Sequence, residues 1–159
     1  MTFREFHKKM VSFVVFSIED ISGVLGGIDR RRLFEWSKKG DIIPVKRGHY
    51  LFAEFKNSHN LGLLIANKIY EPSYISLEYV MSLEGLIPEA VFTYTNVTSK
   101  KTQTFNTAFG HFLYRHVKPA LFAGYGLKKE HFYVHGERID RLLKIAYLEK
   151  AFFDFIYFK

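Results

Sequence analysis

The sequence predicts an α+β protein with two domains, and three observations support this prediction. Over residues 1–57, apolar residues recur mostly at helical spacing and then flank a short basic ribbon. From residue 91 onward the apolar period changes to two, which is typical of strands. The chain is 48% hydrophobic and contains 17 Phe and 10 Tyr, so both parts have enough apolar material for a packed core.

Two helices are predicted before the first pair of glycines. The first is amphipathic, and its apolar face has three members: Phe3, Phe6 and Met10. The second starts at Ser17, which forms a capping-box pattern with Asp20 because each side chain can accept a hydrogen bond from an unpaired amide. Its apolar face has four members: Ile18, Ile21, Val24 and Leu25. Gly26 and Gly27 end this helix, because glycine adopts backbone conformations that other residues avoid.

A third helix is predicted to run from an N-cap at Asp29 to about Lys39, with Gly40 just beyond its end. Its inner side is expected to hold three residues: Leu33, Phe34 and Trp36. Its outer side is expected to hold four: Arg31, Arg32, Glu35 and Lys39. A short hairpin with a basic tip follows, because apolar residues flank the segment 46–49.

This order of capped helix, glycine turn, arginine-led helix and basic ribbon predicts a winged helix-turn-helix domain over residues 1–57. Each piece alone has an ordinary interpretation, since three consecutive arginines are most often a solvated helix face. Together the pieces favour DNA binding, in which the N-terminal half of the recognition helix meets base edges. Residues 29–47 hold seven Lys or Arg against three Asp or Glu, so phosphate attraction would be local and would weaken with salt.

Eight residues are candidates for DNA contact: Arg30, Arg31, Arg32, Lys38, Lys39, Lys46, Arg47 and His49. We expect Arg31 and Arg32 to contribute most in the major groove. Lys46 and Arg47 are expected to hold phosphate or the neighbouring minor groove. One such domain covers a half-site, so repression would need a homodimer or cooperative monomers on an inverted repeat.

The second domain, residues 58–159, is predicted to be a mixed α/β domain with a small, mainly antiparallel sheet. Helices are expected at three places: residues 61–69, 74–83 with Ser76 as the cap and Gly85 at the end, and 148–157. Strands are expected at residues 91–95, at 101–107 returning after a turn at 99–101, at 109–117 and around 131–135. The strand at 109–117 is apolar on both parities, so it is expected to be buried on both faces.

Several function classes are disfavoured. The chain has no cysteine, which excludes disulfides and thiolate metal sites. It contains no phosphate loop, dinucleotide fingerprint or nucleophile elbow, so we expect a protein that is not an enzyme and has no cofactor. The apolar run at residues 11–16 is too short for a signal peptide or a membrane span, so a cytoplasmic protein without a membrane partner is expected.

Two side-chain groups invite a catalytic interpretation that the spacing does not favour. His131 and His135 would share a face on a helix, but on the predicted strand they stand roughly 13 Å apart, so no metal site is expected. Lys150 and Asp154 are four residues apart on a predicted helix, where they would form an ordinary surface ion pair. Glu149 lies on a different side of that helix, so these three residues do not form a nuclease triad.

Four segments together resemble a known family. They are RGHYL at 47–51, YISLEYVMSLEGLIPE at 74–89, TYT at 93–95 and AYLEKAFFDFIY at 146–157. This succession resembles the AbiEi family of antitoxins from bacterial type IV toxin–antitoxin systems, over about residues 15–157. Members of that family continue beyond the last motif, so we expect the apolar final helix to expose surface unless something covers it.

The resemblance implies a bifunctional protein. An N-terminal winged helix would repress its own operon at promoter inverted repeats, and a C-terminal domain would counteract a nucleotidyltransferase-like toxin without necessarily forming a stable complex with it. The DNA-facing residues that it implies are basic positions already chosen above: Arg30, Arg31, Arg32, Lys38, Lys46, Arg47 and His49.

Two alternatives remain open. One is a stand-alone winged-helix regulator with no toxin partner. The other is an RNA-binding protein, because residues 109–118 and 128–135 interleave aromatic and basic side chains as stacking platforms do. The same alternation is also expected of a sheet with one apolar face and one wet face, and we favour that interpretation.

Overall fold

The computed structural model describes all residues from 1 to 159 and shows a mixed α+β protein with six α-helices and two sheets. The chain divides into two compact units, one of residues 1–61 and 131–141 and one of residues 62–130 and 142–159. The segment 131–141 is the tip of a long hairpin, so the first unit contains a piece of chain that the sequence pattern places in the second domain. None of the helices is long and apolar enough to cross a membrane.

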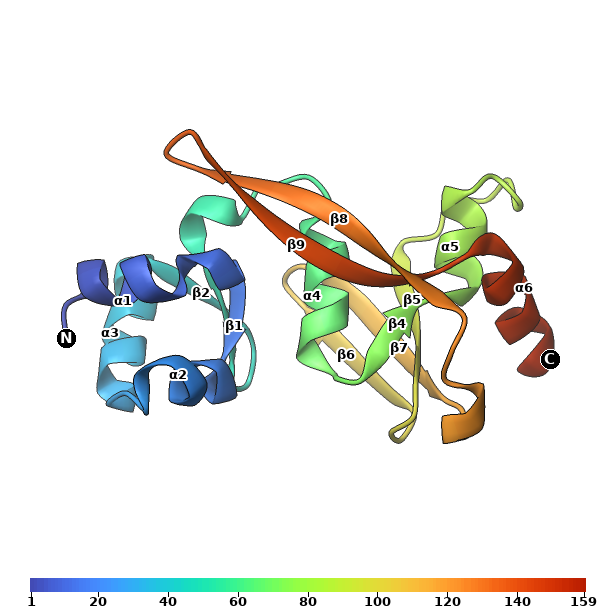
Figure 1. Ribbon diagram of the computed structural model, residues 1–159, viewed down its shortest axis with the longest axis horizontal. Helices are drawn as coiled ribbons and strands as arrows, with labels where there is room; N and C mark the ends of the chain where they lie inside the picture. Colours follow the sequence, from blue (N-terminus) through green and yellow to red (C-terminus); the bar gives the residue numbers. More distant parts are fainter. The chain divides into compact units, whose positions relative to one another are not determined.

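The first unit combines three helices with a three-stranded antiparallel sheet (Figure 1). Its helices are α1 (Phe3–Met10), α2 (Ile18–Leu25) and α3 (Arg30–Lys39), with short 3-10 turns at Val11–Phe13 and Ala53–Phe55. Its strands are β1 (Val15–Ser17), β2 (Ile42–Lys46) and β3 (His49–Phe52), in the order β1-β3-β2.

The predicted starts and ends of α2 and α3 are confirmed. Ser17 Oγ accepts a hydrogen bond from the Asp20 amide at 3.1 Å, and Asp20 Oδ2 accepts one from the Ser17 amide at 2.9 Å. These two bonds satisfy amides that a helix start leaves unpaired. Asp29 caps α3 by accepting from the Arg31 amide, and Gly40 ends it with a φ of 88°, which favours glycine.

An aromatic cluster fills the core of the first unit, because α1, α3 and the sheet each contribute large apolar side chains to it. Phe6, Phe16, Trp36 and Phe52 lie at ring separations of 4.8 to 5.8 Å, and all four are buried. The placement of Phe34 beside Leu33 and Trp36 was wrong, since Phe34 is 69% exposed. Neighbouring residues on a helix are rotated by about 100°, and that rotation turns Phe34 away from the core.

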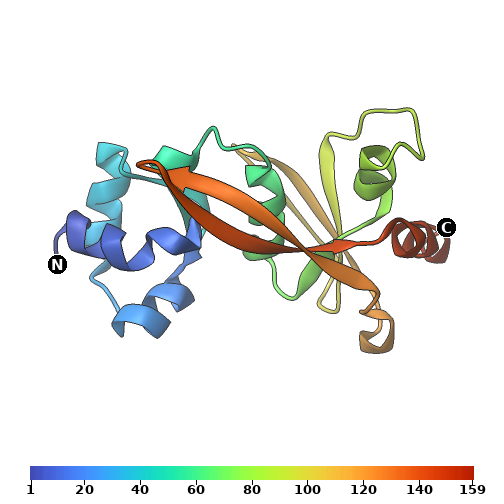
Figure 2. The same ribbon diagram turned by 45° about the horizontal axis from the view of Figure 1, so that its top comes forward.

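The second unit is built on a six-stranded mixed sheet in the order β6-β7-β5-β4-β9-β8. Its strands are β4 (Ser73–Ile75), β5 (Thr93–Thr98), β6 (Gln103–Thr107), β7 (Gly110–His116), β8 (Tyr125–Val134) and β9 (Glu137–Ala146). Its helices are α4 (Leu61–Ile69), α5 (Leu77–Leu83) and α6 (Leu148–Tyr157), with a 3-10 turn at Pro119–Leu121. In both views α4 lies on one side of the sheet, and α5 and α6 lie on the other (Figures 1 and 2).

The topology of this sheet differs from the prediction. The strand after the turn at 99–101 does not return beside β5; β6 pairs with β7, and β5 pairs with β4 and, in parallel, with β7. β4 and β9 form the second parallel pair. Burial explains the order, because β5 is buried over its last four residues while the polar β6 is largely exposed, as suits an edge strand.

Two further predictions for this unit were wrong. The segment around Tyr74 is a strand followed by α5, not one continuous helix, and both Tyr74 and Ile75 are fully buried. β7 is not buried on both faces, since only Phe112 and Tyr114 are buried while the residues between them are half-buried or exposed. Tyr114 faces α4, where its hydroxyl donates to the carbonyl of Ala66.

The pair of Lys150 and Asp154 is not a surface pair, because Asp154 is only 1% exposed. Its carboxylate accepts hydrogen bonds from Tyr74 Oη at 3.0 Å and Ser76 Oγ at 2.7 Å, and Lys150 Nζ lies 2.8 Å from it. Ser76 is the N-cap residue of α5 as predicted, but its hydroxyl is used in this network and does not cap the helix. Burial, and then the negative charge of Asp154, raise the pKa of Tyr74 above its usual value.

One face of α6 carries four side chains that are each about half exposed: Phe152, Phe153, Ile156 and Tyr157. The expectation of an exposed apolar surface is therefore met, although Phe155 and Phe158 of the same segment are half-buried.

Candidate nucleic-acid interface

A groove in the first unit brings together four of the eight predicted site residues. It has a cavity volume of about 640 Å³ and lies between the start of α2, the start of α3 and the β2–β3 turn. The four predicted residues that line it are Arg30, Lys46, Arg47 and His49. Arg30 is sixteen positions before Lys46 in the sequence, so the fold, and not sequence proximity, creates this basic lining.

The backbone holds the β2–β3 turn against the start of α2. The Ile18 amide donates to the carbonyl of Gly48 at 3.0 Å, and Gly48 has a φ of 80°, a conformation that glycine adopts without strain. β2 is an edge strand, so Pro44 can sit in it without removing a sheet hydrogen bond. The turn therefore presents Arg47, which is exposed, from a fixed backbone position.

The first turn of α3 presents three exposed arginines, of which Arg31 is held by a local ion pair. Its Nη2 lies 3.1 Å from Asp29 Oδ2, and its Nε lies 3.3 Å from the same oxygen. Hydrogen bonds from Arg31 hold the pKa of Asp29 below its usual value, and Asp29 in turn raises the pKa of Arg31. Arg31 is thus charged and oriented at the helix start, and part of its charge offsets the capping carboxylate.

Lys38 and Lys39 lie in the last turn of α3 and do not line the groove. At about 1.5 Å of rise per residue, they stand roughly 12 Å along the helix axis from Arg30. Both are exposed, as is Arg32, which also lies outside the groove lining. The predicted set therefore divides into two groups of four. One group lines the groove, and the other is exposed at the two ends of α3: Arg31, Arg32, Lys38 and Lys39.

Sequence reasoning missed several residues that line the groove. Glu19 lies at its edge and lowers the local positive charge, while Pro44 and Tyr50 supply apolar and aromatic surface. Tyr50 is half-buried and stacks on Phe16 with ring centroids 5.8 Å apart. Alternation could not have found Tyr50, because Leu51 and Phe52 are both buried and β3 therefore has no regular change between a buried and an accessible face.

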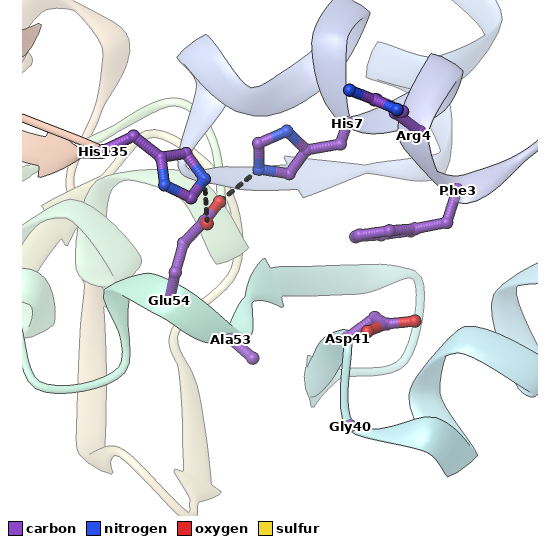
Figure 3. Close-up of a pocket in the computed structure, with 8 residues that line it drawn as sticks. All are labelled: Phe3, Arg4, His7, Gly40, Asp41, Ala53, Glu54 and His135. Atoms are coloured by element: carbon purple, nitrogen blue, oxygen red, sulfur yellow. Dashed lines mark hydrogen bonds and ion pairs between the residues drawn. The ribbon is translucent and has the colours of Figure 1, made fainter. Parts of the chain in front are cut away.

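A second cavity of about 370 Å³ in the first unit is lined by two histidines and two carboxylates (Figure 3). His7 Nε2 is paired with Glu54, and His135 Nε2 lies 4.0 Å from the other oxygen of the same carboxylate. No serine, cysteine or lysine lines this cavity, and nowhere in the structure do His, Asp and Glu residues form a group that could hold a metal ion. Glu54 is therefore paired with His7 of α1, while the His135 side chain is 83% exposed and its separation from Glu54 is longer than a hydrogen bond.

Three histidines on β7 and β8 have local partners. His131 Nδ1 lies 2.6 Å from Asp140 across the hairpin, and His116 Nδ1 lies 2.8 Å from the carbonyl of Lys100. His111 pairs with Asn106, and His135 lies in the turn after β8 with a φ of 50°. The two histidines at 131 and 135 therefore do not share one strand as predicted.

The aromatic residues proposed for an RNA surface are mostly core residues. Phe112, Tyr114 and Phe132 are buried, and Tyr133 is 62% exposed on the opposite parity of β8 from Phe132. Such alternation is typical of a sheet with one apolar face.

Neither a scan against protein-family models nor a search of curated proteins finds a match to this chain. The geometry of the groove is thus the main support for a function.

Proposed function

We propose that the first unit is a winged helix-turn-helix that binds double-stranded DNA, and that the protein is a transcriptional autorepressor. The observation that carries this proposal is the convergence of Arg30 from α3 with Lys46, Arg47 and His49 from the β2–β3 turn around one groove. α3 would be the recognition helix and the β2–β3 hairpin would be the wing.

The charge distribution fits the duplex that such a domain contacts. DNA carries one negative charge per about 1.7 Å of axis, so a basic helix start and a basic turn can contact phosphates on either side of a groove. The exposed face of α3 would enter the major groove, which is about 12 Å wide and admits a helix. The turn would then follow the neighbouring backbone, with Arg47 on phosphate or in the minor groove.

The test is a salt titration of DNA binding by the full chain and two matched double variants. In one, Arg30→Ala and Arg47→Ala remove charge from the groove; in the other, Lys8→Ala and Lys9→Ala remove equal charge from α1, which is outside both the groove lining and the proposed recognition helix. Loss of two phosphate contacts would make the decline of log K with log salt shallower, by about 2 in the slope. We expect that change, and a loss of at least tenfold in affinity, for the groove variant, with a smaller effect for the α1 variant. Equal effects of the two variants would show that net charge, and not the groove, drives binding.

We also propose that the protein is an antitoxin acting against a nucleotidyltransferase-like toxin. This part is supported by the resemblance alone, above all by the segments 74–89 and 146–157. Co-expression with the neighbouring toxin gene should restore growth. Failure of the protein to restore growth would leave a stand-alone regulator.

A further inference from the structure

Phe34 is the most exposed large apolar side chain of the first unit, at 69%. It lies in the middle of α3, whose other apolar residues, Leu33 and Trp36, are buried. Exposure of one apolar residue on a surface is ordinary. The position of this one, within the row of cations on the proposed recognition helix, is what calls for an explanation.

The helical repeat places Phe34 on the same face as two cations. Arg30, Phe34 and Lys38 follow one another at intervals of four residues, so each lies roughly 6 Å along the axis from the next. Leu33 and Trp36 face the core, so this row faces outward. An aromatic ring between two exposed cations matches a surface that has apolar groups between anions.

The major groove of DNA is such a surface. Phosphates line its two edges, and each thymine places its C5-methyl group on the groove floor, where apolar side chains can contact it. An apolar protein partner fits less well, because binding would bury Arg30, Arg31 and Lys38 beside the ring, and charged residues are depleted in the cores of protein interfaces.

We propose that Phe34 contacts a thymine methyl group in the major groove and makes the protein select T at one position of each half-site. This inference rests on the proposed DNA-binding function and adds to it a source of sequence preference. The basic residues around the groove would supply affinity for any duplex through phosphate contacts. Phe34 would supply discrimination, because only T presents a methyl group there.

The experiment uses the full chain and a duplex that the wild-type protein selects from a random-sequence library. Each thymine of that duplex is replaced in turn by deoxyuridine, which keeps the base pairing and removes only the methyl group. We expect one replacement per half-site to weaken wild-type binding about fourfold, the value of one buried methyl-sized group. The same replacement should leave the binding of the Phe34→Ala variant unchanged.

Phe34→Ala itself should weaken binding to the selected duplex by about tenfold, the size of one mismatched base pair, and leave the salt slope as in wild type. Because Phe34 is largely exposed, its truncation should leave the melting temperature nearly unchanged. Phe92→Ala is the matched control, since Phe92 is 83% exposed in the second unit and should not affect DNA binding.

Three results would overturn the inference. If the wild type selects no sequence, both the proposed function and this inference fail. If it selects one, but deoxyuridine has no effect at any position or weakens the Phe34→Ala variant as much as the wild type, the function stands and the inference fails. If Phe34→Ala binds DNA as wild type does but changes the oligomeric state in sedimentation, Phe34 belongs to a contact between protein chains.

Discussion

Replacement of Asp154 by alanine should destabilise the second unit far more than loss of a surface ion pair. The carboxylate is 1% exposed and accepts hydrogen bonds from Tyr74 and Ser76, both also buried. Without it, two buried hydroxyls lose an acceptor at a cost of about 1.5–2 kcal/mol each. Lys150 retains its bond to the carbonyl of Leu121 at 3.2 Å, so its charge is not left without a partner. The expected loss is about 3–5 kcal/mol, the range seen for broken buried pairs.

The assay is amide hydrogen exchange followed by mass spectrometry on peptides that cover β4 and α6. Because the only tryptophan, Trp36, lies in the first unit, its fluorescence would not report this change directly. Exchange in those peptides should become faster by about a hundredfold to a few thousandfold.

Two variants serve as controls for this prediction. Asp154→Asn keeps the volume and one acceptor oxygen, so its loss should be about half as large. Glu71→Ala removes a carboxylate that is 58% exposed and lies 3.7 Å from the half-buried Lys68, and it should cost no more than about 1 kcal/mol. If these peptides exchange no faster in Asp154→Ala than in Glu71→Ala, the reasoning that this network stabilises the second unit is refuted.

Three further predictions concern stability. Ser17→Ala removes the capping box of α2 and should cost about 1 kcal/mol in denaturant unfolding, and an unchanged midpoint would contradict this. Gly62→Ala places a Cβ 1.9 Å from Tyr94 Oη and should cost about 1–3 kcal/mol of stability. Gly23→Ala meets no atom within 4 Å and should be neutral or stabilise the protein by up to about 1 kcal/mol. Similar unfolding midpoints for these two variants would contradict the close packing at Gly62. Burial raises the pKa of Tyr114 above its value in the unfolded chain, which is about 10. The contribution of Tyr114 to the free energy of unfolding is therefore constant below about pH 10 and falls above it by about 1.4 kcal/mol per pH unit. Unfolding measured from pH 9 to 11 should show a steeper decline for wild type than for Tyr114→Phe, and parallel curves would exclude this linkage.

Local chemistry explains which elements could be predicted from the sequence. The caps at Ser17 and Asp29 and the stops at Gly26 and Gly40 depend on neighbours within a few residues, and the helices they delimit lie where the pattern predicts. The β2–β3 hairpin is local in the same sense, because its two strands are joined by a two-residue turn. The basic groove followed from these elements, but the meeting of Arg30 with the turn could not be derived from periodicity.

Non-local pairing explains what could not be predicted. The choice of β7 as the partner of both β5 and β6 depends on which strands bury the most surface, and the turn at 99–101 contains no information on that choice. Asp154 was assigned to the surface because helical spacing shows a partner at Lys150 but not the hydroxyls of Tyr74 and Ser76 about eighty residues away. Phe34 was placed in the core because its neighbours are there, and only the rotation of α3 shows otherwise.

The most direct test of the central claim is competition between two duplexes of equal length for the full chain at physiological salt. One duplex is the DNA upstream of the protein's own gene, and the other is its scrambled sequence. We predict that the upstream duplex binds at least a hundredfold more tightly and that the preference persists as salt rises, because base contacts depend less on salt than phosphate contacts do. Equal and weak binding to both duplexes would contradict the claim, and the basic groove would then be an electrostatic surface without a specific DNA partner.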